Sequence, residues 1–315
     1  MSVNATSHAP IAVIGFGDLA SPLEPLWPST HRALLPLAGK SLIVYLVEQL
    51  ADAGIRHIRI AGSIQQFAVR RRLGNGAEWG VTVRYSDLHG EELFAECLAS
   101  EGRCLYLRGD ELYDADYSSL PTADALAGIA PDLAPGDPGY WLLADGELRG
   151  FSTGAASLSV SYANPIATIR DYHEANLRVA RGLLPRLNVP GAALHRGAVA
   201  DWQTDIAPTA AIGDDVFIGK HSRVGHLARL RYRCVLSNGV MIDNGAQLEN
   251  VSILPNCFVG RELRVRNAII GPDGLLGFDG THIAIDNEQL LAPTRHNQEV
   301  RTGLPDRMVG GAFGA

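Results

Sequence analysis

The stretch that decides the fold is Ile14–Pro36, which reads IGFGDLASPLEPLWPSTHRALLP. It continues a short aliphatic run, Ile11–Ile14, that is typical of a buried parallel strand. A glycine-bearing turn after such a strand can bind phosphate, because backbone N–H groups approach the anion with no Cβ in the way. Gly15, Gly17 and Asp18 are the candidate cofactor-binding residues, and Asp18 places a negative charge where a phosphate would lie. The stretch has the frame of a nucleotide-binding loop with little of its chemistry.

Strand and helix patterns alternate after this loop. Helices are expected at Leu42–Ala53, Ile64–Leu73 and Glu91–Ser100, and strands at Ile58–Ala61, Val81–Tyr85 and Cys104–Leu107. The alternation predicts a Rossmann-like α/β domain with a parallel sheet and right-handed crossovers. Ligands of such sheets bind beyond the carboxyl ends of the strands, where Asp18 and Asp110 are expected. Pro121–Gly139 is rich in Ala, Gly, Pro and Asp, and is expected to form turns and loop rather than a packed element.

Four segments in matching order carry a resemblance to a known family. Ile14–Pro36 matches, without a gap, a signature of the form L-A-G-G-x-G-T-R-L-x-P-L-T-x-x-x-P-K-x-L-L-P. Leu37–Leu42 is similar to V-A-G-K-P-L, Arg108–Leu112 to N-G-D-x-L, and Ile166–Asn176 to I-G-T-P-E-D-Y-x-E-A-N. Residues 11–180 thus resemble the sugar-nucleotide pyrophosphorylases, NDP-sugar nucleotidyltransferases of the mannose-1-phosphate guanylyltransferase type. The resemblance implies transfer of a nucleotidyl group to a sugar 1-phosphate, with Asp110 holding the catalytic magnesium ion.

Several residues that this chemistry needs are replaced. Relative to the signature, the second loop glycine is Asp18, the third is Ala20 and the loop arginine is Pro22. Arg32 stands at the family's lysine position and keeps its positive charge, although the two cations differ in geometry. The family's second magnesium-binding aspartate falls on Pro165, which cannot ligate a metal. We therefore expect a degenerate member without catalytic activity and without a resident cofactor.

A six-residue hydrophobic repeat fills the second half of the chain. From Ile206 to Leu254 an aliphatic residue recurs at every sixth position, with a small or apolar residue two positions before it. This is the hexapeptide pattern of the left-handed parallel β-helix, in which three hexads form one triangular coil around the aliphatic side chains. After Leu254 the frame moves by one residue, to Val259 and Val265, which predicts a bulge or a small insertion. The expected domains are residues 1–180, a β-helix at 190–275, and a C-terminal arm or tail at 276–315.

Three functions stay open at this point. The first is a scaffold or regulatory subunit in sugar-nucleotide or polysaccharide biosynthesis. The second is an active sugar-1-phosphate nucleotidyltransferase that uses magnesium, with Arg32 as the remnant of the family lysine and Asp110 as the metal ligand. The third is a hexapeptide-repeat acyltransferase in which His226 is the general base, because Val224–Ala228 resembles the V-G-H-x-C hexad of such enzymes. A dinucleotide fingerprint at Gly15–Gly17 lacks its third glycine.

The composition of the chain limits the kinds of partner and the location that we expect. A net charge of -7 argues against binding to nucleic acid. The four cysteines lack metal-ligand spacing and the first residues show no secretory signal, so a reduced, cytoplasmic chain is expected. No transmembrane segment is expected, because no stretch is long and apolar enough. A β-helix exposes strand edges at its ends, so we expect a homo-oligomer or a hetero-complex with another biosynthesis protein.

Overall fold

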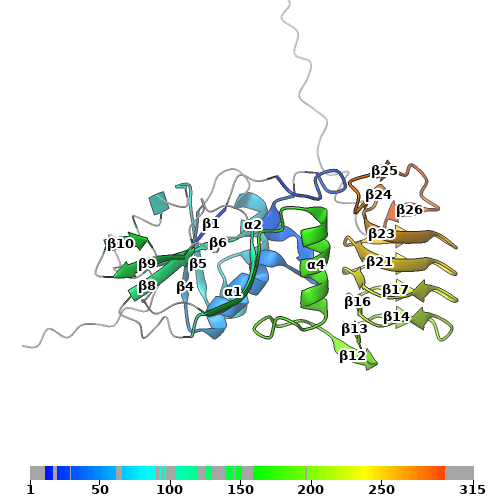
Figure 1. The fold of residues 1–315 in the computed structure, drawn as a ribbon, viewed down its shortest axis with the longest axis horizontal. Helices are drawn as coiled ribbons and strands as arrows, with labels where there is room; N and C mark the ends of the chain where they lie inside the picture. Colours follow the sequence, from blue (N-terminus) through cyan, green and yellow to red (C-terminus); the bar gives the residue numbers. More distant parts are fainter. Residues whose placement is uncertain are drawn as a thin grey trace, which may run out of the picture.

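The computed structural model consists of a mixed α/β half and a coiled β half, with one helix between them (Figure 1). It describes residues 11–16, 20–28, 30–61, 66–89, 92–93, 96, 104–118, 125–129, 140–144, 147–150, 159–195 and 197–294. Within these ranges, no helix has both the length and the apolar character needed to cross a membrane.

A parallel sheet forms the centre of the first half, as the alternating pattern predicts. Its strand order is β5-β4-β1-β6, and every neighbouring pair is parallel. The strands are β1 (Ile11–Gly15), β4 (His57–Ala61), β5 (Thr82–Ser86) and β6 (Cys104–Arg108). Helices α1 (Leu42–Asp52) and α2 (Gln66–Leu73) lie close to their expected positions. Every residue of β1 is buried, which explains its continuous aliphatic sequence. The helix expected at 91–100 falls largely outside the described residues.

Short elements and antiparallel strands complete this half. They are η1 (Arg32–Leu34), β2 (Pro36–Leu37), β3 (Lys40–Ser41), η2 (Ala77–Trp79), β7 (Leu112–Asp116), β8 (Ala125–Ile129), β9 (Tyr140–Ala144), β10 (Glu147–Gly150) and β11 (Ser159–Asn164). The loop expected at Pro121–Gly139 is wrong in part, because β8 pairs antiparallel with β9. Pairing with the next strand along the chain overrides local composition at this position.

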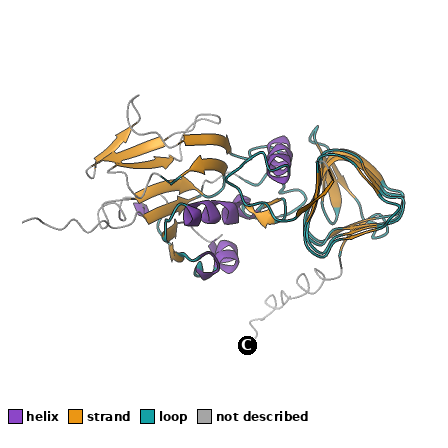
Figure 2. Ribbon diagram, turned by 90° about the horizontal axis from the view of Figure 1, so that it is seen from below, coloured by secondary structure: helices purple, strands orange, loops and turns teal. Residues whose placement is uncertain are grey.

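Three parallel walls form the second half, and Figure 2 shows them end-on as a triangle. The first wall contains β14 (Asp205–Ile206), β17 (Arg223–Val224), β20 (Met241–Ile242) and β22 (Cys257–Val259). The second contains β15 (Ala211–Ile212), β18 (Arg229–Leu230) and the first halves of β21 (Gln247–Ile253) and β23 (Arg264–Ile270). The third contains β13 (Ala198–Ala200), β16 (Val216–Ile218), β19 (Cys234–Leu236) and the second halves of β21 and β23. This pairing is compatible with the predicted β-helix, whose left-handed sense stays a prediction.

The six-residue frame shifts before Leu254 rather than after it, and it shifts because one residue is missing rather than added. Leu230 pairs with Leu248, 18 positions further on, whereas Leu236 pairs with Ile253, only 17 positions further on. Ile253, and not Leu254, therefore takes the inward position of the frame. The corner between Leu248 and Val251 holds two residues, where the corner of the preceding coil holds three. The predicted bulge or insertion after Leu254 is wrong, because a shortened corner before it accounts for the new frame.

Antiparallel strands flank the coil at both ends. β12 (Ala192–His195) pairs with β13 at the start. At the other end, β24 (Gly274–Gly277) pairs with β23, β25 (His282–Ala284) pairs with β24, and β26 (Leu291–Pro293) pairs with β22. Residues 276–294 of the expected arm or tail are thus largely folded against the coil.

Helix α4 (Ile169–Ala180) joins the two halves. It begins at a capping box, in which Thr168 and Asp171 each accept a hydrogen bond from the other's backbone N–H. On its buried face, His173 Nδ1 lies 2.8 Å from Ser252 Oγ of the coil. Asn176 accepts a hydrogen bond from the N–H of Ala38 at 2.8 Å, on the side of the sheet domain. Polar contacts on one helix therefore tie both halves together.

Candidate active site

The carboxyl ends of β1 and β6 lie side by side and hold the candidate residues. Gly15 pairs with Arg108, and the N–H of Gly109 donates to the carbonyl of Gly15 at 2.8 Å. A Cβ at Gly109 would lie 2.5 Å from side-chain atoms of both Ile14 and Phe16, so only glycine fits between these strand ends. This close approach places Asp110 directly beside the start of the predicted nucleotide loop. Gly17 and Asp18, the other two candidate loop residues, lie outside the described residues.

Asp110 is fully buried and its carboxylate is bound by Arg108. Arg108 Nε donates to Asp110 Oδ1 at 3.2 Å, and Arg108 Nη2 donates to Asp110 Oδ2 at 3.2 Å. The guanidinium therefore contacts both carboxylate oxygens in a forked arrangement. Arg108 Nε also lies 3.0 Å from Glu111 Oε1, and the hydroxyl of Tyr113 donates to the other oxygen of Glu111. The carboxylate of Asp110, the candidate metal ligand, is thus part of a network of hydrogen bonds and ion pairs with side chains of the same chain.

Arg32 approaches the same carboxylate from another element. It begins η1, where His31 caps the turn by accepting a hydrogen bond from the N–H of Ala33 at 3.1 Å. Arg32 is only 2% exposed, and its Nη1 lies 3.7 Å from Asp110 Oδ2. In the described part of the chain, none of its three side-chain nitrogens has a hydrogen-bond partner. The structure thus brings together the two predicted remnants, Arg32 and Asp110, in a buried ion pair.

Burial and charge shift the pKa values of these cations in different directions. Burial lowers the pKa of Arg32, and the attraction of Asp110 opposes that effect without cancelling it. Burial also acts to lower the pKa of Arg108, but the hydrogen bond and charge of Asp110, together with Glu111, outweigh it and raise the pKa. Burial lowers the pKa of His31, against the raising effect of Asp110. Asp110 therefore favours the charged form of each group that surrounds it.

The residues around Asp110 fit a magnesium ion poorly. Mg²⁺ requires octahedral oxygen coordination, usually from one or two carboxylates with water and phosphate oxygens. Asn164 pairs with Leu112 across β11 and β7, so Pro165 follows β11 at the sheet end where Asp110 precedes β7. No carboxylate is therefore supplied at position 165. Among the described residues, no three His, Cys, Asp or Glu side chains gather as a metal site. Metal binding by Asp110 stays a prediction of the enzyme alternative.

His226 lies on the coil, in the turn between β17 and β18. Its Nδ1 is 3.0 Å from Thr209 Oγ1, and its N–H donates to Asn244 Oδ1 at 2.7 Å. Both partners occupy neighbouring coils, so the contacts fix the corner of the coil. The contacts found for the described residues do not connect His226 with Arg32 or Asp110. His226, the candidate base of the acyltransferase alternative, therefore lies in a different part of the fold from the site at the strand ends.

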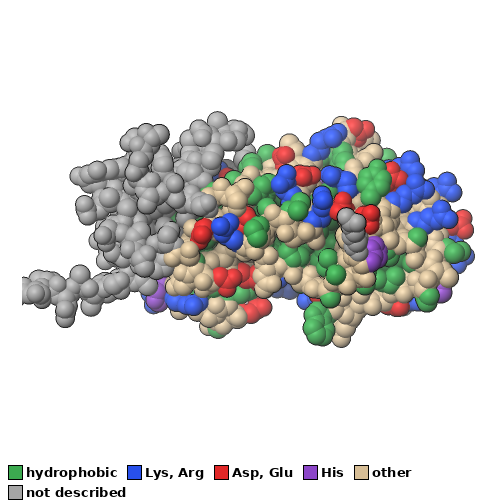
Figure 3. All heavy atoms as spheres, turned by 60° about the horizontal axis from the view of Figure 1, so that its bottom comes forward, with side chains coloured by type: hydrophobic (Ala, Val, Ile, Leu, Met, Phe, Trp, Pro, Cys, Tyr) green, Lys and Arg blue, Asp and Glu red, His purple; other side chains and the backbone are tan. Residues whose placement is uncertain are grey.

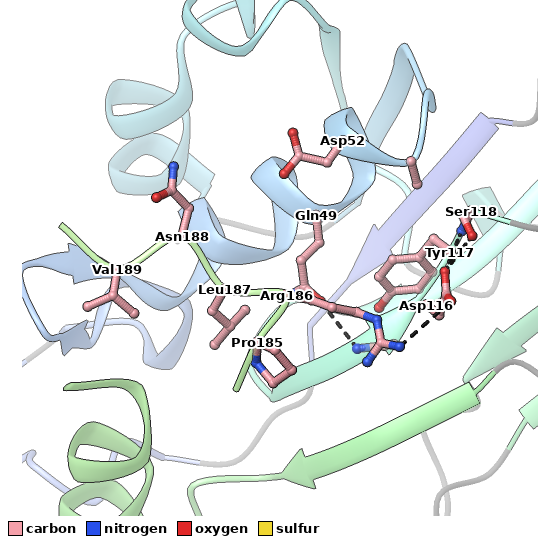
Figure 4. A pocket seen from close by; sticks show the side chains of 12 residues that line it. Gln49, Asp52, Asp116, Tyr117, Ser118, Pro185, Arg186, Leu187, Asn188 and Val189 are labelled. Carbon is pink, nitrogen blue, oxygen red and sulfur yellow. Dashed lines mark hydrogen bonds and ion pairs between the residues drawn. The ribbon is translucent and has the colours of Figure 1, made fainter. Parts of the chain in front are cut away.

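A separate pocket lies at the far end of β7 from Asp110. Its volume is about 510 Å³, and Asp52, Gln49, Asp116 and the segment Pro185–Val189 contribute to its wall (Figure 4). Arg186 points toward the acidic side of this pocket, with Nη2 3.6 Å from Asp116 Oδ2. Neither Arg32 nor Asp110 lines it, so the pocket is not part of the site at the strand ends.

Comparison with known proteins finds a family match over the segment that contains these site residues. Residues 12–125 match the model of the nucleotidyl transferase family, and this segment contains all of β1 except Ile11, the loop, Arg32 and Asp110. Residues 12–125 are thus similar to nucleotidyl transferases, and curated sugar-nucleotide transferases match this chain over shorter segments. The predicted resemblance is confirmed, and the parallel sheet is the fold that it implies.

The curated relatives match this chain over short segments. A mannose-1-phosphate guanylyltransferase of Mycobacterium tuberculosis is 29% identical over 79 residues, 25% of this chain and 22% of the relative. A glucose-1-phosphate thymidylyltransferase of Xanthomonas campestris pv. campestris is 35% identical over 75 residues, 24% of this chain and 25% of the relative. A low-salt glycan biosynthesis nucleotidyltransferase of Haloferax volcanii is 34% identical over 70 residues, 22% and 20% respectively. The chain spans a quarter or less of the length of these relatives.

Arg108 is the site residue that the sequence argument missed. It stands at the asparagine of the family's N-G-D-x-L motif and is the last residue of β6. The motif resemblance predicted a role for Asp110 and assigned none to Arg108, which differs from the family's asparagine. An arginine two positions before a candidate metal ligand was the available signal, since it brings a competing cation to the same strand end.

Proposed function

We propose that this member of the nucleotidyltransferase family is catalytically inactive and acts as a scaffold or regulatory subunit in sugar-nucleotide or polysaccharide biosynthesis. The observation that carries the proposal is the forked contact of Arg108 with both oxygens of Asp110. A second guanidinium, that of Arg32, lies 3.7 Å from the same carboxylate. The cations of the chain itself therefore occupy the surroundings in which the family generally uses magnesium.

Energetics support this reading of the site. A magnesium ion at Asp110 would have to displace or coexist with Arg108, which is 8% exposed, and Arg32, which is 2% exposed. Separating a buried ion pair by removing one partner costs about 3–5 kcal/mol, because the other charge stays buried without compensation. Pro165 offers no second carboxylate to offset such a cost. The replacements at Asp18, Ala20 and Pro22 weaken phosphate binding in the same domain.

The joined halves support a scaffold role. Asn238 Nδ2 on the coil donates to the carbonyl of Gly39 at 2.8 Å, next to the contact of Asn176 with Ala38. A domain held rigidly on a coil presents fixed surfaces to a partner, whether a second copy or another biosynthesis protein. A cytoplasmic location and the absence of a resident cofactor belong to this proposal as expectations.

Calorimetric titration with nucleoside triphosphates, with and without magnesium, tests the proposal. A scaffold gives no magnesium-dependent binding heat. An active sugar-1-phosphate nucleotidyltransferase gives such heat, and Asp110→Ala removes it. An acyltransferase would instead release CoA thiol in a reaction abolished by His226→Ala, with Thr209→Ala as the matched change at the same corner. Magnesium-dependent nucleotide binding or His226-dependent thiol release would overturn the proposal.

A further inference from the structure

In the described part of the chain, one of the three coil walls ends in an open strand edge. At the C-terminal end of the coil, β26 covers the first wall and β24 covers the third. Within β23, only the second half, Ala268–Ile270, pairs with β24. In the ranges that the structure describes, no strand pairs with the outer edge of Arg264–Arg266, the last strand segment of the second wall.

Among the described residues, this position stays empty because the chain turns back after β24. Strands of the second wall pair at a spacing of 17 residues in the last coil, as Val265 does with Leu248. Continuing that spacing would place Thr281–Ile283 beside Arg264–Arg266. His282 and Ile283 pair instead with β24, in the hairpin that closes the third wall. A cavity of about 770 Å³ lies there, lined by Arg264, Val265 and Arg266 on one side and by hairpin residues such as Phe278 and Ile283 on the other.

The backbone N–H groups at this edge point in the direction in which the coil would continue. Along the second wall, the N–H of Arg229 donates to the carbonyl of Ala246 in the next coil at 2.7 Å, and Gln247 donates to Leu263 at 2.8 Å. By the same repeat, the N–H groups of Arg264 and Arg266 point toward the empty position. A strand edge with directed donors can be completed by an extended peptide, which adds itself to the sheet through main-chain hydrogen bonds.

The side chains at this edge select for negative charge. Arg264 and Arg266 are exposed and point to the outer face, as do Arg229 and Arg231 two strands away. Arg231 and Arg266 share one carboxylate, Glu249, at 3.3 and 3.4 Å. No ion pair of Arg264 is found among the described residues. Basic side chains gather visibly on the coil half of the molecule, although the whole chain is acidic (Figure 3).

The spacing of the arginines defines the shape of the ligand. Alternate residues of a strand lie about 7 Å apart on one face, so Arg264 and Arg266 cannot converge on a single small anion. An extended peptide repeats its side chains at the same interval. Its central residue would point inward beside Val265, which is 6% exposed and continues the apolar stack from Leu248. The matching pattern is therefore acidic, apolar, acidic.

We propose that the outer edge of Arg264–Arg266 binds an extended acidic segment of a partner protein by strand addition, with two carboxylates beside the arginines and an apolar side chain in the cavity. A single-stranded nucleic acid fits the wall less well, because stacked bases need aromatic platforms. Among the described residues, Tyr232 is an exposed aromatic near this wall, and its hydroxyl donates to Glu249 at 3.1 Å. The proposal goes beyond the scaffold role and holds whether or not the strand-end site is catalytic.

Fluorescence anisotropy with the full chain tests the proposal. The probe is a labelled, capped heptapeptide, Ser-Thr-Glu-Val-Glu-Thr-Ser, and the control peptides carry Lys-Val-Lys or Glu-Pro-Glu at the centre. We expect saturable binding of the first peptide and binding weaker by about tenfold or more for both controls. Arg264→Glu should weaken binding by a similar factor, whereas Arg223→Glu, an exposed arginine paired with Asp205 on the first wall, should leave it unchanged.

Hydrogen exchange gives a second, independent readout. Peptide binding should slow exchange of the Arg264 and Arg266 amides and leave that of Arg223 unaffected. Four outcomes would overturn the proposal: no saturable binding, equal binding of the Lys-Val-Lys peptide, unchanged affinity in Arg264→Glu, or displacement of the peptide by an equally charged oligothymidylate at lower concentration.

Discussion

Arg108 donates from two nitrogens to the two carboxylate oxygens of Asp110, each at 3.2 Å, in a buried setting. By the motif resemblance, this aspartate stands at the position of the family's catalytic metal ligand, and the arginine stands at the position of an asparagine. A side chain that is neutral in the family motif is thus replaced by a cation that satisfies the carboxylate. In the proposed function, this ion pair in the turn between β6 and β7 takes the place of a contact with a metal ion.

Removal of this carboxylate should destabilise the protein strongly. We expect Asp110→Ala to lower the free energy of unfolding by about 3–5 kcal/mol, because Arg108 and Arg32 lose their shared partner while buried. Urea unfolding followed by circular dichroism measures the change. Asp205→Ala, which breaks the exposed pair with Arg223, is the matched control and should cost about 1 kcal/mol or less. Equal costs for the two variants would contradict the buried-pair account.

Acid should weaken the contact between α4 and the coil. Burial lowers the pKa of His173 to about 4 from 6.5, with Asn250 opposing the shift, Arg233 adding to it and Glu174 opposing it. The unfolded chain therefore binds a proton between pH 6.5 and pH 4 that the folded chain does not, so stability falls as the pH falls through this window. The full loss from this group is about 3 kcal/mol.

Urea midpoints measured across that window check the expectation, with His173→Gln as the non-titrating control. The variant should lose less stability than the wild type on acidification. A wild-type slope equal to that of His173→Gln would show that His173 does not carry the effect.

Loss of Asn176 should loosen the junction of the two halves. Its side chain accepts from the N–H of Ala38 at 2.8 Å and donates to Ser252 Oγ at 3.2 Å, and the residue is fully buried. We expect Asn176→Ala to cost about 2 kcal/mol, because buried donors and acceptors lose their partners. Asn75→Ala removes a similar contact in an exposed turn and should cost less than about 1 kcal/mol. Thermal unfolding that ranks the two changes in the opposite order would contradict this role.

Periodic patterns predicted the fold more fully than its irregular parts. The aliphatic run of β1 and the six-residue repeat both report burial, and burial follows directly from side-chain type and spacing. The shortened corner at Glu249–Asn250 was misplaced, because a frame shift becomes visible only once the next inward residue departs from the pattern. Strand β8 was missed because its pairing with β9, the next strand along the chain, leaves little trace in the local composition.

In the candidate site, the sequence likewise predicted the residues at motif positions but not the contacts between their buried side chains. Asp110 and Arg32 were found because they occupy motif positions, and the structure brings them within 3.7 Å of each other. The contact of Arg108 with Asp110 depends on which way two buried side chains point from the end of β6. Gly109 allows that close turn against Ile14 and Phe16, and sequence alone does not show such an approach.

Pyrophosphate release tests the central claim most directly. The purified chain is mixed with magnesium, each of the common nucleoside triphosphates and a set of hexose 1-phosphates, and pyrophosphate is followed by an enzyme-coupled absorbance assay. The account predicts no release above the level without protein, for wild type and for Asp110→Ala alike. Turnover by the wild type that disappears in Asp110→Ala, with the fold retained by circular dichroism, would contradict it.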